Sequence, residues 1–322
     1  MDVTRMTQTE KNKPVVPKIQ WKLVKQLRIN WELYLLILLP FIYVIVFHYI
    51  PMYGLQIAFK NFNLAKGMFA SKWIGLAHFD RFFHSYQFVL LLKNTLVLSL
   101  YNLVVGFPFP ILLAISLNYL RNERFKKVVQ MTTYAPHFIS VVVIAGLVTQ
   151  MLSVRTGFVN NLIELLGGER INFLGNSAYF KSIYVWSGVW QEAGWGSIIY
   201  LAALAGIDPQ LHEAALMDGA SKVRRIWHID LPGIAPTIII LLIMNIGRIM
   251  NVGFQKVLLL QNPLNMESSE VIDTYVYNIG IASGLPNFSY VTAIGMFKSV
   301  ISLILIICAN KIAKKISDTS LW

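Results

Sequence analysis

Six long apolar stretches, separated by short polar segments, constrain the fold of this chain more than any other feature of its sequence. Each is close to the length of roughly 20 residues that an α-helix needs to cross a bilayer. Only 14% of the residues are charged, compared with about 25% in a soluble domain, and the mean hydropathy is +0.56. We therefore predict an all-α membrane protein with six transmembrane helices, at residues 31–49, 91–120, 131–152, 182–206, 234–260 and 288–310.

The remaining residues leave no room for a separate catalytic domain of about 100–150 residues. We expect a basic N-terminal segment at 1–30, a six-span transmembrane domain at 31–312 and a short tail at 313–322. The first apolar stretch is too long for the core of a signal peptide, and no small-residue cleavage site follows it, so it is predicted to remain as the first span.

Two local features qualify this pattern. Pro108 and Pro110 fall inside the second stretch and predict a kink or break there. Residues 52–90 are rich in aromatic side chains and are predicted to lie along the bilayer surface as an amphipathic segment. The aromatic residues expected to make this contact are Trp73, Phe79, Phe82 and Phe83.

The charge distribution predicts the orientation. The chain has 28 Lys and Arg against 16 Asp and Glu, a net charge of +12. In a membrane protein, Lys and Arg collect on the cytoplasmic side. If the N-terminus is inside, seventeen Lys and Arg lie in the inner segments and seven in the outer ones. Both termini are therefore predicted to be cytoplasmic. The single cysteine, Cys308, cannot form an internal disulfide.

The polar loop at 208–232 is the most informative segment. Asp208 can cap a helix that begins at Pro209, and Gly219 can end that helix in a left-handed conformation. Ser221 can cap a second short helix, which we expect Pro232 to end. The loop is thus predicted to form two short helices at right angles, a rigid projection on the cytoplasmic side.

This loop resembles the EAA loop of ABC importer permeases. The matching residues are Glu213-Ala214-Ala215, then Gly219 after three residues, Ile229 after nine more, and Leu231-Pro232 after one. The resemblance implies a type I ABC importer permease fold, in which the first loop helix is a coupling helix that inserts into a groove of an ATPase subunit. The residues that it assigns to ATPase coupling are Glu213, Ala214, Ala215, Asp218, Gly219, Ile229, Leu231 and Pro232.

Further segments resemble the sugar permeases of this family, and in particular the subgroup that imports complex oligosaccharides such as alginate and pectin fragments. They are Trp73 to Phe79, Lys93 to Leu96, Val271 to Tyr277, Asn287 to Tyr290 and Ser320 to Trp322. The resemblance implies a bacterial cytoplasmic-membrane subunit that pairs with a second, homologous permease. It also implies two copies of a cytoplasmic ATPase, an external solute-binding protein or lipoprotein, and an oligosaccharide substrate.

No catalytic or metal site is predicted in this chain. The phosphate-binding pattern G-x-x-x-x-G-K-[ST] is absent, so ATP and Mg²⁺ are expected only in the partner ATPase. His212-Glu213-Ala214-Ala215-Leu216 lacks the second histidine of the zinc motif H-E-x-x-H. We expect no cofactor, and no nucleic-acid partner, because the basic residues follow the membrane topology.

Polar and aromatic residues inside the predicted spans give two hypotheses. Glu192, Arg248 and Lys298 either form an ion pair that joins spans four, five and six, or leave a spare cation that attracts an acidic sugar. Trp and amide side chains could form a wall along which a sugar stacks and hydrogen bonds. The residues of this predicted substrate pathway are Trp186, Trp190, Gln191, Glu192, Trp195, Asn245, Arg248, Asn251 and Lys298.

The alternative function is an ion-gradient-driven secondary transporter of a polar solute. Such transporters often contain two similar halves with broken helices, and no similarity between halves is seen here. An intramembrane enzyme would need a catalytic cluster, which the sequence does not provide.

Overall fold

The structure of this chain is a computed structural model that describes residues 29–316 and 320–321. It divides into two units, residues 1–56 and 57–322. The regular secondary structure of the described residues is helical apart from one short two-stranded hairpin. The basic segment predicted at 1–30 lies outside the described residues except for its last two. Residues 317–319 and 322 of the predicted tail also lie outside them.

One apolar helical run begins in the first unit, at Trp31, and ends at Phe59, three residues beyond the last residue of that unit. α2 (Trp31–Val44) continues through a π-helical turn, η1 (Ile45–Tyr49), into α3 (Ile50–Met52), and the 3₁₀ turn η2 (Tyr53–Phe59) follows. The run Trp31–Phe59 has 29 residues, enough to cross a bilayer. It extends beyond the predicted stretch because Pro51 does not end it. The wide π turn before Pro51 makes room for the ring, which in an α-helix clashes with the carbonyl four residues earlier.

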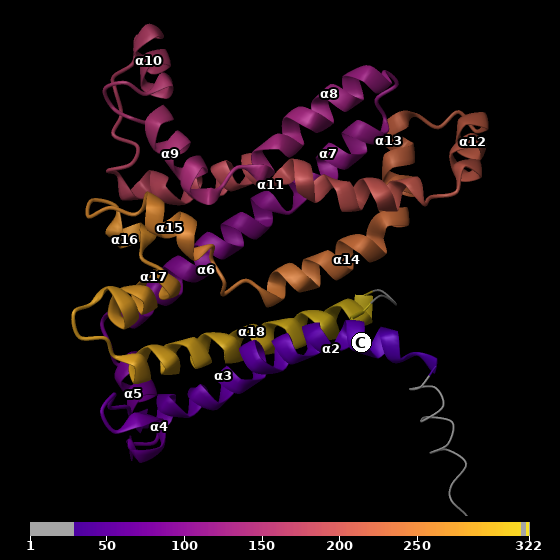
Figure 1. The fold of residues 1–322 in the computed structure, drawn as a ribbon. Helices are drawn as coiled ribbons and strands as arrows, with labels where there is room; N and C mark the ends of the chain where they lie inside the picture. The colour runs from indigo at the N-terminus through magenta and orange to yellow at the C-terminus, as the bar shows by residue number, and fades with distance from the viewer. Residues whose placement is uncertain (1–28, 317–319, 322) are drawn as a thin grey trace, which may run out of the picture. The chain divides into compact units, whose positions relative to one another are not determined.

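Long helices form the framework of the second unit (Figure 1). α6 (Gln87–Gly106) and α7 (Pro108–Asn118) make one run of 32 residues, in which only Phe107 is unassigned and its backbone stays helical. The proline pair therefore interrupts the helix for one residue. α11 (Ser177–Ala205) packs against both α6 and α7, and α18 (Phe288–Ile316) packs against α14 (Leu231–Gly247).

Four helical runs within the described residues are long and apolar enough to cross a membrane. They are Trp31–Phe59, Gln87–Asn118, Lys222–Gly247 and Phe288–Lys315. A bent pair of helices makes a fifth candidate if it counts as one span. α11 has 29 residues but is not among them, since its Ser, Gly, Gln and Glu residues lower its hydropathy. The number of six transmembrane helices therefore stays a prediction.

The third apolar stretch is not one continuous helix, although the bent pair that it forms can still count as one span. α8 (Glu123–Tyr134) and the 3₁₀ turn η3 (Ala135–Phe138) are followed by α9 (Val141–Met151) at an angle of 104°. Pro136 cannot donate a backbone hydrogen bond, and the Ser140 side chain caps the new helix by accepting from Val143 N. Ser140 is a typical N-cap residue, but the continuous hydrophobicity around it led to the prediction of one unbroken helix.

The fifth apolar stretch, predicted as one span over 234–260, is broken after Gly247, and the run long enough to cross a membrane is Lys222–Gly247. α14 ends at Gly247, and α15 (Phe254–Leu260) begins only after Arg248–Gly253, which the structure leaves without regular helix. Lys256 falls in α15. The break matters for function because it lets polar side chains face inward at this level, where an unwound backbone is tolerated if it is buried in protein or lines a cavity.

The segment predicted to lie on the bilayer is partly a core element. It contains a hairpin of β1 (Lys60–Asn61) and β2 (Lys72–Trp73), with Lys60 opposite Trp73, and the helices α4 (Gly67–Ala70) and α5 (Ala77–Phe83). Trp73 and Phe83 are exposed, as an interfacial role requires. Phe82, however, is only 1% exposed and packs against rings of α6 and α18. The prediction that Phe82 lies on the bilayer surface was wrong, because the spacing of apolar residues does not reveal whether lipid or another helix covers them.

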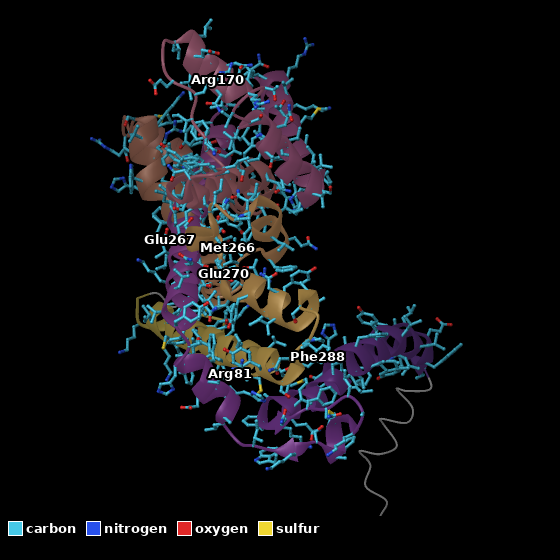
Figure 2. All side chains as sticks on the ribbon, turned by 90° about the vertical axis from the view of Figure 1, so that its left-hand side faces the viewer. Arg81, Arg170, Met266, Glu267, Glu270 and Phe288 are labelled. Atoms are coloured by element: carbon cyan, nitrogen blue, oxygen red, sulfur yellow. The ribbon has the colours of Figure 1, made fainter. Side chains whose placement is uncertain are left out.

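Short elements cover the amino end of α11. They are α10 (Phe158–Leu165), α16 (Met266–Ser269), α17 (Ile272–Tyr277) and the π turn η5 (Asn278–Ala282). Asn94 of α6 fixes α16 by donating to the carbonyls of Glu267 and Glu270, which lie together with Met266 in Figure 2. Burial raises the pKa of the Glu270 carboxyl above its ordinary value.

The second unit has two distinct ends (Figure 1). α10, α16 and α17 lie toward the amino end of α11. The loop at 119–122, the loop at 206–221 and the carboxyl end of α18 lie toward the opposite end. Between them the core forms three clusters of buried apolar side chains, which join α6 to α11 and α15, α5 to α17 and α18, and α7 to α14.

Candidate functional site

The first candidate site is the loop at 208–232, which begins with the predicted helix. α12 (Pro209–Met217) starts at Pro209, and the Asp208 carboxylate accepts a hydrogen bond from Gln210 N at 2.9 Å. Proline at the first position costs nothing, since its missing N–H would have no helical partner there. The local sequence alone therefore specifies where this helix begins.

Gly219 ends α12 as predicted. Its φ is +72°, a left-handed conformation that side chains other than glycine rarely adopt. Gly219 N donates to Leu216 O at 3.0 Å and Ala220 N to Ala215 O at 2.9 Å, which satisfies the last carbonyls of the helix. A Cβ on Gly219 would meet no atom within 4 Å, so the backbone conformation alone requires glycine.

The second part of the loop differs from the prediction. Ser221 caps α13 (Lys222–Arg225) through Arg224 N, as expected, but Pro232 does not end a short helix. The backbone continues through the π turn η4 (Ile226–Asp230) into α14. As at Pro51, the wide turn leaves room for the proline ring. The projection is therefore one short helix, α12, next to the end of a long one.

The buried carboxylate of Asp230 connects α12 and the beginning of α14 to α7. Asp230 is 0% exposed and accepts a hydrogen bond from the Tyr119 hydroxyl at 2.7 Å. His212 of α12 lies 3.4 Å away from its other oxygen. The Arg225 guanidinium lies over the Tyr119 ring, 5.6 Å from its centre. Sequence reasoning missed Asp230 and Tyr119, although an acidic residue between Ile229 and Leu231 was a visible signal.

The outer surface of this loop is apolar at several positions. Leu211, Leu216, Met217, Val223 and Trp227 are exposed, and Met217 has 89% of its surface accessible. Glu213 and Ala214 are exposed, whereas Ala215 is half-buried beside a hollow of about 320 Å³ lined also by Asp218, Arg224 and Arg225. Within the described chain Glu213 has no ion-pair partner. This is a surface suited to docking on another protein.

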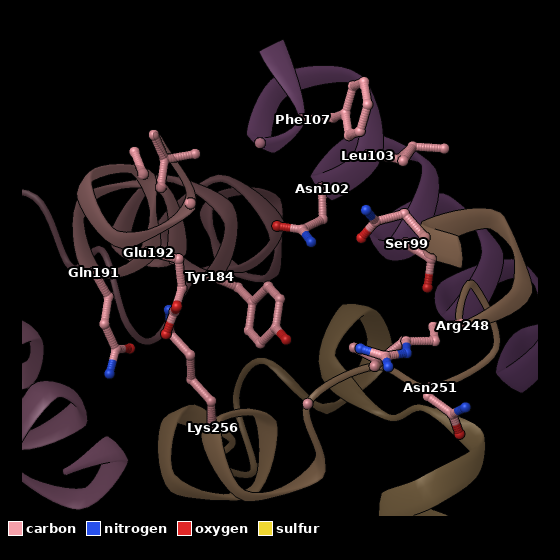
Figure 3. A pocket seen from close by; sticks show the side chains of 18 of the residues that line it. Ser99, Asn102, Leu103, Phe107, Tyr184, Gln191, Glu192, Arg248, Asn251 and Lys256 are labelled. Carbon is pink, nitrogen blue, oxygen red and sulfur yellow. The ribbon is translucent and has the colours of Figure 1, made fainter. Parts of the chain in front are cut away.

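The second candidate site is a cavity of about 710 Å³ inside the second unit. Ser99 and Asn102 of α6 line one side, Tyr184 and Glu192 of α11 another, and the broken segment after α14 a third (Figure 3). Its volume is within the range of 300–1,000 Å³ typical of ligand pockets.

Most of the predicted pathway residues line this cavity, but three do not. Gln191, Glu192, Trp195, Asn245, Arg248 and Asn251 are among its lining residues. Trp186 packs edge-to-face on Phe109 instead, with 5.4 Å between ring centres, and it and Trp190 are about half exposed. Their spacing of one helical turn places both on a different face of α11 from Glu192.

Glu192, Arg248 and Lys298 form no ion pair with one another in the described structure. Lys298 pairs with Asp273 of α17, a residue outside the predicted spans. The Glu192 carboxylate lies 2.9 Å from Nδ1 of His137. The His137 ring stacks on the Trp195 ring, with 4.6 Å between the ring centres. Arg248 has no carboxylate partner anywhere in the described ranges.

Lys256 is the residue that sequence reasoning overlooked. It lines the cavity and is only 7% exposed, and its ammonium lies 5.1 Å from the centre of the Tyr184 ring. A single lysine in the apolar run Phe254–Leu260 was a sufficient signal. Over the described residues, no three His, Cys, Asp or Glu side chains are grouped so that they could hold a metal ion.

Comparisons with known proteins identify the family of this chain. The family described as "Binding-protein-dependent transport system inner membrane component" matches residues 106–318. The chain is 46% identical to the polygalacturonan/rhamnogalacturonan transport system permease protein YteP of Bacillus subtilis, over 98% of this chain and 100% of YteP. It is 44% identical to protein LplB of the same organism, over 92% of each chain.

Solved structures agree with these relatives. A chain of a bacterial ABC transporter involved in the import of the acidic polysaccharide alginate has a TM-score of 0.85 and is 42% identical, covering 92% of this chain and 99% of that one. A chain of the bacterial alginate ABC transporter in complex with an alginate pentasaccharide-bound periplasmic protein has the same TM-score of 0.85, with 41% identity. The protein studied here belongs to the family of binding-protein-dependent transport system inner membrane components.

Proposed function

We propose that this chain is one permease subunit of an ATP-driven ABC importer of oligosaccharides. A second, homologous permease completes the translocation pathway, two copies of a cytoplasmic ATPase supply the energy, and an extracytoplasmic solute-binding protein delivers the sugar. The family match and the relatives named for polysaccharide transport support this proposal. The chain itself is a non-catalytic translocation component, so ATP and Mg²⁺ bind to the ATPase.

The observation that carries the proposal is the geometry of the 208–232 loop. α12 is capped at both ends and presents exposed Glu213 together with apolar side chains. In the proposed assembly α12 is the coupling helix and docks in a groove of the ATPase. Closure of the two ATPases draws the two coupling helices of the permease pair together.

The contacts of Asp230 offer a route for this movement. α13 is continuous with α14, and Asp230 accepts a hydrogen bond from Tyr119 at the end of α7 and lies 3.4 Å from His212 of α12. A displacement of α12 is thereby passed to two long helices that line the cavity. In the proposed orientation this end of the molecule and both termini face the cytoplasm, in agreement with the distribution of Lys and Arg. The chain spans the membrane six times, with α11 and the bent α8–α9 pair counted as spans.

The proposal is tested by uptake into vesicles that contain the complete complex. ATP-dependent uptake of an oligosaccharide is expected for the wild type. Glu213→Lys reverses the exposed charge on α12 and is expected to lower uptake at least tenfold while the permease still inserts into the membrane. Glu169→Lys, in the exposed loop after α10 at the opposite end of the unit, is the matched control, because Glu169, like Glu213, forms no ion pair among the described residues; it should leave the ATPase bound. Wild-type uptake by Glu213→Lys would contradict the coupling role.

An ion-gradient-driven transporter is not favoured, because the family match and the relatives all concern ABC systems. The same vesicles distinguish the two functions, since a secondary transporter would accumulate sugar when an ion gradient replaces ATP.

A further inference from the structure

The charges of the central cavity are not balanced. Two cations, Arg248 and Lys256, line it, and Glu192 is the single acidic residue among its lining residues. The Glu192 carboxylate is engaged with His137 at 2.9 Å. It influences Lys256 electrostatically, but no ion pair within 4 Å joins the two. In the part of the chain that the structure describes, neither cation has a carboxylate partner.

Lys256 is the more unusual of the two cations. It is 93% buried, and no hydrogen bond to its ammonium is formed by any of residues 29–316 or 320–321. Burying an uncompensated charge is unfavourable unless a partner is supplied. The face of the Tyr184 ring offsets only part of this cost. The ammonium is not among the fully enclosed polar atoms, so it remains accessible from the cavity.

Lys298 is an example of a lysine with a purely structural role in this fold. It lies in α18 with 15% of its side chain exposed, and its charge is neutralised by Asp273. The fold thus pairs one intramembrane lysine internally and leaves another free beside an open volume. The difference indicates that the partner of Lys256 comes from outside the chain.

We infer that Lys256 and Arg248 together form the binding site for the carboxylate of an acidic sugar residue, a uronic acid, as it passes through the cavity. This inference rests on the proposed importer function and names the substrate chemistry of its pathway. Figure 3 shows both cations on the floor of the cavity, with Asn102 and Ser99 on the opposite wall and Asn251 beside Arg248. These polar groups can bond sugar hydroxyls while the cations hold the carboxylate through charge-assisted hydrogen bonds.

The experiment compares Lys256→Met with Lys298→Met in vesicles that contain the complete complex. The two substrates are a galacturonic acid oligomer and its methyl ester, which has the same rings and linkages without the charge. Lys256→Met is expected to lower uptake of the acid at least about tenfold relative to wild type, the loss of a charge-assisted hydrogen bond, and to leave uptake of the ester nearly unchanged. Lys256→Arg should restore most of the acid uptake.

The control variant gives a different pattern. Lys298→Met strands Asp273 and should lower uptake of both substrates alike, in proportion to the amount of assembled complex. Methionine at 256 removes an uncompensated charge from a buried position, so loss of folding is not expected. Equal loss of acid and ester uptake by Lys256→Met, at wild-type amounts of complex, would overturn the carboxylate site and leave the importer function intact.

A second measurement removes the contribution of the solute-binding protein. The purified complex without that protein is heated with and without the galacturonic acid oligomer. The acid should raise the Tm of the wild type and not that of Lys256→Met, and the ester should raise neither. An equal Tm rise in wild type and Lys256→Met would also overturn the site. Absence of ATP-dependent uptake of either sugar by the wild type would reject the importer function itself.

Discussion

The loop at 208–232 and the central cavity are organised on different principles. The loop is specified by residues close in sequence: Asp208 begins α12, Gly219 ends it, and each makes its decisive hydrogen bonds within five residues. The cavity is assembled from α6, α11, α14 and α15, segments up to about 150 residues apart. A surface that docks on a partner needs a fixed local shape, whereas a pathway needs side chains gathered from several helices.

The strongest test of this contrast is at Gly219. Gly219→Val places a β-branched residue at φ +72°, where only the backbone conformation requires glycine. We expect ATP-dependent uptake to fall at least about tenfold, because α12 can no longer end at that residue. Asn tolerates the left-handed region, so Gly219→Asn should retain most of the uptake. Similar uptake by the two variants would show that the loop does not depend on this local conformation.

A smaller effect is expected where the cavity region depends on long-range pairing. Lys298→Met leaves Asp273 without its partner across α17 and α18, with an expected loss of about 3–5 kcal/mol in the free energy of unfolding. The double variant Lys298→Met/Asp273→Asn should recover most of that stability, measured by denaturant unfolding of the purified protein. If the double variant is less stable than Lys298→Met, the two residues do not act as a pair.

The smallest effect concerns the contact that links the loop to the helices around the cavity. Tyr119→Phe removes one hydrogen bond to the buried Asp230 carboxylate, which should cost about 1.5–3 kcal/mol of unfolding free energy. Tyr134→Phe is the matched control, because no hydrogen bond of its hydroxyl is found among the described residues. We also expect Tyr119→Phe to hydrolyse more ATP per sugar imported, since movement of α12 would pass less directly to α7. If Tyr119→Phe leaves the ratio of ATP hydrolysed to sugar imported unchanged, Tyr119 has a structural role only.

The errors of the sequence interpretation have one physical origin. Hydrophobicity locates the apolar stretches but does not reveal where a helix bends, so the third and fifth stretches were predicted as single spans although Ser140 and Gly247 mark their breaks. Pro232 was read as a helix end, yet a π turn before it lets the helix continue, as another π turn does before Pro51. Such turns depend on the packing around them, which a local pattern does not contain.

The charged residues show the same limit. Glu192, Arg248 and Lys298 were grouped because all three lie in apolar segments, and the first two do line the cavity. Lys298 instead meets Asp273, which the sequence places in a polar loop, and Lys256 lines the cavity in its place. A pair of residues 25 positions apart on separate helices is decided by how those helices pack.

The sequence by itself determined the membrane class, the family resemblance and the local structure of α12, because apolar length, helix caps and a left-handed glycine act within a few residues. The tertiary structure alone decided which cations remain unpaired, which aromatic residues leave the cavity, and how Asp230 joins the loop to α7. Those outcomes depend on distances between helices far apart in the chain, and the cost of burying a charge is set only when its neighbours are in place.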